Sequence, residues 1–253
     1  MPFIFPVYDL GRTTDGSIIL PDAGPVYEYT PPPESGAQHW LLGGSAASLT
    51  PIAGSATLTP QGTLETYGEN YVEVPSYGNA LLTNIPDQSI QTHMAVVQYQ
   101  PHAGKNTLLL GNLSNGVNGW GNWLSETGQI ATILRGNTPA FSNHGVPTGG
   151  AAAGDYIFIA AVLWEESGVT HYRTIIGAQV FEGQWTGARS VVPVRSAALG
   201  NAWYGPGATI YDDTPVRYAE YIAYPGVAKT AAEISTIYAR SKQRMVSRGI
   251  NLI

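Results

Sequence analysis

From Trp40 onward, short strand-like runs recur between turn signals, and this feature limits the possible folds more than any other. Residues 54–68 and 70–77 alternate apolar and polar side chains, as half-buried strands do. The clearest hairpin spans residues 156–181, has a polar turn that ends at Gly168, and begins with a strand that is apolar on both faces. Such a strand belongs in the centre of a sheet covered on both sides. The recurrence predicts an all-β sandwich or barrel.

A second hairpin is predicted upstream of this one. Glu126, Thr127 and Gly128 have turn-forming character and separate two strand-like runs, residues 123–125 and 129–135. Short loops that contain glycine commonly join neighbouring antiparallel strands, so we expect these two runs to pair.

The chain has one convincing helix, and it lies at the end, directly behind a strand-like run. Thr230 and Glu233 fit a capping box, so we expect a helix over residues 231–247. We expect one side of it to face the core, although a partner-binding role is the alternative. The residues of that side are Ile234, Ile237, Tyr238, Ser241 and Met245.

Composition removes several classes of function. The net charge of −6 argues against nucleic acid as a partner. Basic residues gather in the last 25 positions, where they complement the dipole of the expected helix. The absence of cysteine excludes disulfides, thiol catalysis and cysteine metal sites. No signal peptide is visible in residues 1–16, and the longest apolar run, residues 156–164, is too short to span a membrane.

The first 35 residues differ from the rest of the chain. They are rich in proline and irregular, and residues 30–35, Thr-Pro-Pro-Pro-Glu-Ser, favour a stiff extended connector. We therefore expect residues 1–35 to form an attachment arm or a strap across the main domain, and residues 36–253 to form that domain.

The end of the chain resembles a known family. Residues 219–224, Ala-Glu-Tyr-Ile-Ala-Tyr, and the Thr-x-x-Glu-Ile motif that begins at Thr230 are similar to the last strand and helix of concanavalin A-like lectin/glucanase domains of the laminin-G type. Residues 63–82, 155–180 and 197–205 resemble earlier segments of that family in the same order. The resemblance implies a two-sheet antiparallel jelly-roll sandwich with one C-terminal α-helix, which covers apolar surface that the sheets leave exposed.

Glucanases on this fold carry a Glu-x-Asp-x-x-Glu pattern, which this sequence lacks. Glycoside hydrolysis needs two carboxyl groups about 5–10 Å apart. The nearest acid groupings lie around one strand, in a predicted turn and in a loop: Glu69 with Glu73, Glu165 with Glu166, and Asp212 with Asp213. We therefore expect no catalytic residue, no enzyme activity and no cofactor. The five histidines lack metal-ligand spacing, so no metal site is predicted, and calcium binding through Asp212, Asp213 and Asn201 stays open.

Aromatic residues beside amides are the remaining candidates for a ligand site. Sugars stack their C–H faces on aromatic rings, while amides and carboxylates bind their hydroxyl groups. Two glycine-rich segments offer both ingredients, and the alternative is that their rings close the sandwich core. The candidate ligand-binding residues are Trp120, Asn122, Trp123, Asn201, Trp203 and Tyr204.

These features favour a non-catalytic virion or tail-associated protein of phage type, because such proteins share the fold and need no signal peptide. Its jelly roll would bind a surface carbohydrate or another virion protein, as a homotrimer in many such cases. It would lie on the virion, or in the host cytoplasm before release. The alternatives are a glycan-degrading hydrolase or lyase on the same fold, and a ligand-free decoration component of a particle.

Overall fold

The structure is a computed structural model, and the chain divides into two units, Met1–Thr30 and Pro31–Ile253. Only the second unit is described below, and within residues 142–147 only the backbone. The described residues are 31–62, 66–75, 78–102, 105–114, 118–135, 142–147, 150–203 and 215–253. The prediction that residues 1–35 form an arm or a strap falls mostly outside these ranges and stays a prediction.

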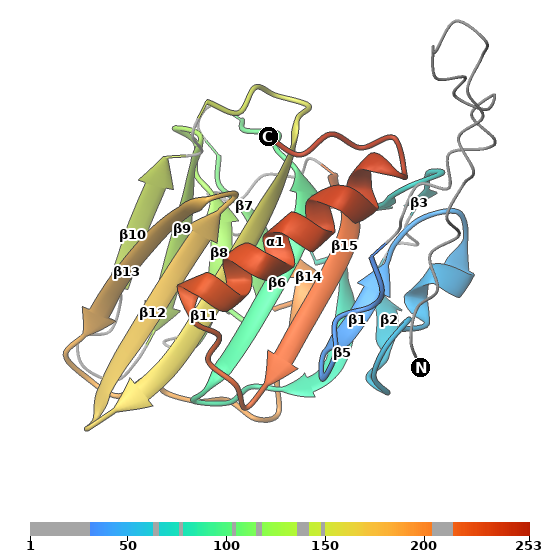
Figure 1. Ribbon diagram of the computed structural model, residues 1–253. Coiled ribbons are helices and arrows are strands. Elements are labelled where there is room, and N and C mark those ends of the chain that lie inside the picture. Colours follow the sequence, from blue (N-terminus) through green and yellow to red (C-terminus); the bar gives the residue numbers. More distant parts are fainter. Residues whose placement is uncertain are drawn as a thin grey trace, which may run out of the picture. The chain divides into compact units, whose positions relative to one another are not determined.

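The first layer is an eight-stranded antiparallel sheet with the order β13-β12-β11-β6-β15-β4-β3, in which β1 also pairs with β15 (Figure 1). Its strands are β1 (Gln38–Leu41), β3 (Thr66–Tyr67), β4 (Val72–Val74), β6 (Gln91–Gln98), β11 (Tyr156–Glu166), β12 (Val169–Ile176), β13 (Gln179–Trp185) and β15 (Val216–Pro225). The predicted hairpin at residues 156–181 is β11 with β12, and the register pairs Glu166 with Val169.

The second layer is a seven-stranded antiparallel sheet with the order β10-β9-β8-β7-β14-β5-β2. Its strands are β2 (Leu58–Gln61), β5 (Ala80–Pro86), β7 (Thr107–Gly111), β8 (Gly119–Leu124), β9 (Gln129–Arg135), β10 (Ser142–Pro147) and β14 (Ser196–Gly200). A short 3-10 helix, η1 (Ala46–Leu49), follows β1. Two antiparallel sheets and one C-terminal helix confirm the predicted sandwich.

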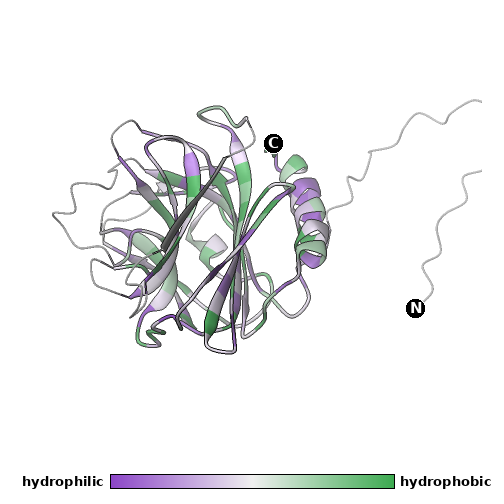
Figure 2. Ribbon diagram, turned by 90° about the vertical axis from the view of Figure 1, so that its left-hand side faces the viewer, coloured by the Kyte–Doolittle hydropathy of each residue, from purple (hydrophilic) through white to green (hydrophobic). Residues whose placement is uncertain are grey.

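Strand β11 shows why its sequence is apolar on both faces. Ile157 and Ile159 belong to the large core between the sheets, which also holds Trp40, Trp120 and Tyr221. The alternate residues of β11 belong to a second core on the other side of the eight-stranded sheet. Helix α1 (Ala231–Val246) crosses that outer side and covers it (Figures 1 and 2). The central, doubly covered position predicted for this strand is confirmed.

Helix α1 begins as the capping box predicts. The Thr230 hydroxyl accepts a hydrogen bond from the Glu233 backbone, and the Glu233 side chain accepts one from the backbone of Thr230. The predicted apolar side packs on the outer core through Ile234, Ile237 and Met245. The helix ends at Val246, one residue before the predicted end. No helix in the described ranges is long and apolar enough to cross a membrane.

Candidate functional site

A groove of about 350 Å³ lies at the end of the β8–β9 hairpin, on the outer face of the seven-stranded sheet. Trp123 and Ala131 are paired across the hairpin and belong to a small outer apolar cluster, apart from the core between the sheets. Polar side chains of the turn and of the residue before β7 complete the groove. The lining residues are Asn106, Trp123, Ser125, Glu126, Thr127, Gln129 and Ala131.

The turn that borders the groove is the one predicted at Glu126–Gly128. The Gly128 N–H donates to the Ser125 carbonyl at 2.9 Å, and the Ser125 N–H donates to the Gln129 carbonyl at 2.8 Å. Gly128 has a φ of 76°, a left-handed conformation that glycine adopts without strain. The glycine at the end of the predicted turn is therefore required by the backbone.

Side chains of the turn itself and of distant parts of the chain hold this turn in place. Asn106 Oδ1 accepts the backbone N–H of Glu126 at 3.1 Å, and Ser125 Oγ accepts that of Gln129 at 3.0 Å. The Tyr99 hydroxyl donates to the Gly128 carbonyl at 3.0 Å. Because these bonds fix the turn without a ligand, binding here needs little ordering of the backbone.

The lining of the groove suits a hydroxyl-rich ligand. Glu126 supplies a carboxylate, Asn106 and Gln129 supply amides, and two hydroxyl side chains lie between them. These groups donate and accept hydrogen bonds in several directions. Trp123 contributes an indole at the floor, although only 6% of its surface is exposed. Among the described lining residues Glu126 is the one carboxylate, whereas glycosidases that use a carboxylate pair need two.

The other two candidates on β8 point away from this groove. Trp120 is fully buried between the sheets, where its ring lies 4.9 Å from that of His93. Asn122 is also fully buried and donates from Nδ2 to Thr132 Oγ1 at 2.8 Å. Successive residues of a strand face opposite sides, so Trp120 and Asn122 face the core when Trp123 faces outward. In this structure neither side chain offers a surface to an external sugar.

The second predicted segment does not join the groove lining described above. Asn201 is buried, and its backbone N–H donates to the Asn79 carbonyl at 3.0 Å. Trp203 is half-buried and donates from its indole nitrogen to the Ser196 carbonyl at 3.0 Å. Tyr204 lies outside the described residues, as do Asp212 and Asp213. Of the five predicted ligand residues that the structure describes, Trp123 is the one that lines the groove.

A chain of buried polar groups runs from Arg189 into the core between the sheets. Arg189 donates from both terminal nitrogens to Asp87 at 2.8 Å, and Gln91 Nε2 donates to the same carboxylate at 3.0 Å. The Gln91 oxygen therefore faces His93 Nε2 at 3.2 Å, and His93 Nδ1 accepts from the Tyr221 hydroxyl at 2.7 Å. Burial lowers the pKa of His93 to about 3, so the ring is neutral at pH 7.

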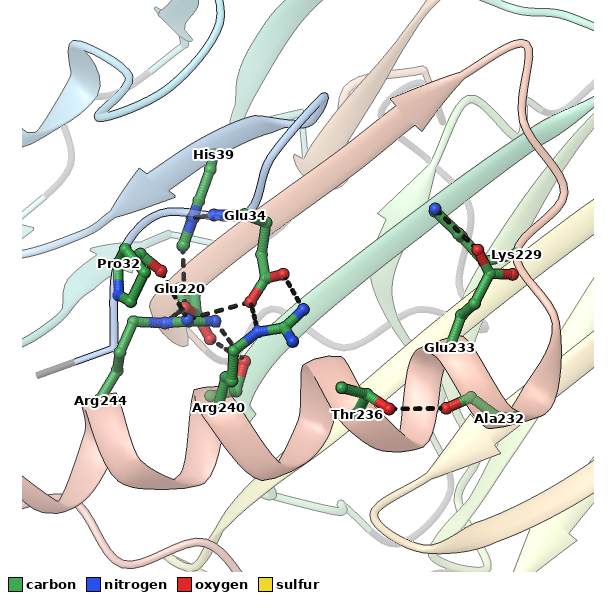
Figure 3. A network of polar contacts seen from close by, with 11 residues as sticks. Pro32, Glu34, His39, Glu220, Lys229, Ala232, Glu233, Thr236, Arg240 and Arg244 are labelled. Carbon is green, nitrogen blue, oxygen red and sulfur yellow. Dashed lines mark hydrogen bonds and ion pairs between the residues drawn. The ribbon is translucent and has the colours of Figure 1, made fainter. Parts of the chain in front are cut away.

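A second buried network, the clasp, joins α1 to β15, β1 and the segment before β1 (Figure 3). Glu220 accepts from His39 Nε2 at 2.8 Å, from Arg244 Nε at 2.6 Å and from the Ser241 hydroxyl. Burial alone would raise the pKa of Glu220, but the bond from His39 and the Arg244 guanidinium hold that pKa below its ordinary value.

The second acid of the clasp is Glu34. It accepts from Arg244 at 3.0 Å and from Arg240 Nε at 2.9 Å, with a further bond from Arg240 to its second oxygen. Its backbone N–H donates to His39 Nδ1 at 3.0 Å, which leaves the ring proton on Nε2, facing Glu220. Glu34 and Glu220 are each at least 98% buried, so these acids hold the fold together and cannot reach a substrate.

No sequence signal pointed to Asn106, and the sequence marked Glu220 only as part of the last-strand motif, without predicting that Glu220 and Glu34 are buried acids. In the part of the chain that the structure describes, no group of three His, Asp or Glu side chains could hold a metal ion. The candidate site is therefore the groove, with Glu126 as its charged member.

No family model matches the chain, and none of the curated proteins matches it. Several solved structures, in contrast, match the chain in fold. A mutant of Trypanosoma rangeli sialidase displaying trans-sialidase activity superposes with a TM-score of 0.59 at 14% identity, over 84% of this chain and 34% of that one. Trypanosoma rangeli sialidase gives 0.55 at 16% identity, over 82% and 33%. A structure of botulinum neurotoxin type C, a toxin whose cell entry depends on interaction with two ganglioside molecules, gives a TM-score of 0.57 at 7% identity, over 80% of this chain and 51% of that one.

These likenesses establish the fold, a β-sandwich of the lectin/glucanase kind, and they correct the expected function. The chain spans about a third of the length of the sialidases and about half of the toxin chain. The prediction of a non-catalytic virion or tail-associated protein is wrong, because the similar structures are glycan-processing sialidases and a ganglioside-dependent toxin. The predicted homotrimer and location stay predictions.

Proposed function

We propose that this chain works in glycan processing and that the groove beside the β8–β9 hairpin holds the glycan. The observation that carries the proposal is the lining of the groove, which combines a carboxylate, two amides and two hydroxyls with the edge of a largely buried indole. Binding sites for small molecules combine a few placed polar groups with an apolar floor in a largely pre-formed cavity. A volume of about 350 Å³ suits one or two sugar rings. The similarity of the fold to that of a sialidase also supports glycan processing.

Binding by this groove should depend on Glu126 and Gln129, whose side chains are exposed and carry no part of the core. The test is a titration of the chain against a panel of oligosaccharides, repeated with the double variant Glu126→Ala, Gln129→Ala. Each lost hydrogen bond is worth about 0.5–1.5 kcal/mol, so affinity should fall about tenfold or more. Glu166→Ala, in the exposed turn of the other hairpin, is the matched control. A wild-type chain that binds no glycan, or a double variant that binds like wild type, contradicts the proposal.

A second candidate function is that the chain itself cleaves the glycan, which the likeness to the sialidases favours. The described lining supplies Glu126 as a single acid, so a second catalytic group would have to come from elsewhere. Release of reducing sugar by the wild-type chain, lost in Glu126→Gln, would support this candidate. Glycan binding without any release would leave the groove as the holding site alone.

A further inference from the structure

We infer that the groove selects neutral glycans over sialylated ones. This inference rests on the proposed function and concerns which glycans the same groove accepts. The inference is based on the negative charge of the groove. Glu126 is the charged side chain among the described lining residues, and the remaining lining groups are amides, hydroxyls and apolar surface. The nearest basic residues along the chain, Lys105 and Arg135, are not among the lining residues.

The hydrogen-bonding groups of the groove match the hydroxyl groups of a neutral sugar. A carboxylate only accepts hydrogen bonds, and a sugar hydroxyl can donate to it. The amide of Gln129 both donates and accepts, so it can bind a hydroxyl group in either sense. The Thr127 hydroxyl already shares a hydrogen bond with Ser125 Oγ at 2.9 Å and can still accept one from a sugar hydroxyl. The backbone of Glu126 is fixed beside the groove, because its N–H donates to Asn106 Oδ1 at 3.1 Å.

A sialic acid residue would bring a second carboxylate into the same space. It only accepts hydrogen bonds, so it cannot pair with Glu126, and it adds a like charge. Two like charges about 5 Å apart at a protein surface weaken binding roughly tenfold or more. Sites that favour a carboxylate instead present arginine, whose planar fork binds it through two parallel bonds. The described lining presents no arginine.

The experiment compares oligosaccharide pairs that differ only by a terminal sialic acid, such as lactose and 3′-sialyllactose, within a broad panel. Binding to the wild-type chain, Glu126→Gln and Glu166→Gln is measured by titration at low and physiological salt. We expect the wild-type chain to bind the neutral members about tenfold more tightly than the sialylated ones. This ratio should be larger at low salt, where charges are screened less. Glu126→Gln should weaken binding of the neutral members, because it replaces a charged acceptor by a neutral one, but it should bring the ratio between neutral and sialylated members to about threefold or less. Glu166→Gln should leave both the affinities and this ratio unchanged.

The possible outcomes distinguish this inference from the proposed function. If the wild-type chain binds glycans in the groove but prefers the sialylated members or treats both alike, the inference is overturned and the proposed function stands. The inference is likewise overturned, and the proposed function stands, if Glu126→Gln leaves the ratio unchanged. If no member of the panel binds, the proposed function fails, and this inference fails with it.

Discussion

Replacing Glu220 by glutamine tests whether the clasp stabilises the sandwich. The substitution keeps the volume of the side chain and removes its charge. Glu220 accepts three hydrogen bonds, from His39, Arg244 and Ser241, inside a fully buried site. Bonds to a charged group contribute about 1.5–3 kcal/mol each. Their sum would be an overestimate, because Arg244 keeps a second partner in Glu34 at 3.0 Å.

A loss of about 3–5 kcal/mol is the expected result, the range found when one partner of a buried ion pair is removed. Urea unfolding followed by circular dichroism measures it. With a slope of about 3 kcal/mol per molar for a domain of this size, the midpoint should fall by about 1–1.7 M. The control is Glu182→Gln, which breaks an ion pair with Arg173 at a half-exposed position and should change stability by less than about 1 kcal/mol.

The pH dependence gives an independent check on the same residue. The folded-state pKa of Glu220 lies below its ordinary value, so its contribution is present above about pH 4.3 and is lost as pH falls below it. Glu220→Gln should therefore reduce the acid loss of stability below that pH. If Glu220→Gln shifts the urea midpoint no more than Glu182→Gln does, or leaves the acid profile unchanged, the clasp does not stabilise the fold as argued.

Three further predictions concern the cores and the helix. Burial lowers the pKa of His93 to about 3, so the free energy of unfolding should fall as pH drops from about 6.5 toward 3. Urea midpoints measured across that range should fall less steeply for His93→Gln than for the wild-type chain. Asp87→Asn should cost about 3–5 kcal/mol in urea unfolding, because Arg189 loses both of its bonds to a carboxylate. Thr230→Ala should cost about 1 kcal/mol in thermal unfolding, since it removes the cap of α1, and Thr236→Ala on the same helix should cost less.

Much of the fold could be predicted because its signals are local. A strand that is apolar on both faces must be central, and a capping box marks where a helix begins. The turn at Glu126–Gly128 was also predictable, because its glycine adopts a left-handed conformation. These features need only a few consecutive residues, and the structure confirms each of them.

The candidate site was only partly predictable, and β8 shows why. The sequence places Trp120 and Trp123 together in one glycine-rich segment as candidate ligand residues. The segment is a strand, however, and a spacing of three places the two rings on opposite faces. The glycines allow close packing instead. A Cβ atom on Gly121 would lie 2.9 Å from Leu108 Cδ1 and 3.0 Å from the Leu110 carbonyl oxygen, so a larger residue would force its neighbours to shift. Asn106 gave no signal, because only the pairing of β7 with β8 brings it near the turn.

The burial of Glu220 also depends on pairing between strands, so it could not be predicted from neighbouring residues alone. The same pairing explains why the final strand and the helix act as one motif. Tyr218 and Tyr221 both face the core between the sheets, although regular alternation would separate residues three apart. The register of β15 against β6 shifts between Tyr218 and Glu220, and this bulge turns Glu220 toward the helix. Glu220 can then bind Ser241 and Arg244. The helix covers the outer face of one sheet, and the groove lies on the outer face of the other, so variants of the clasp and of the groove should act independently.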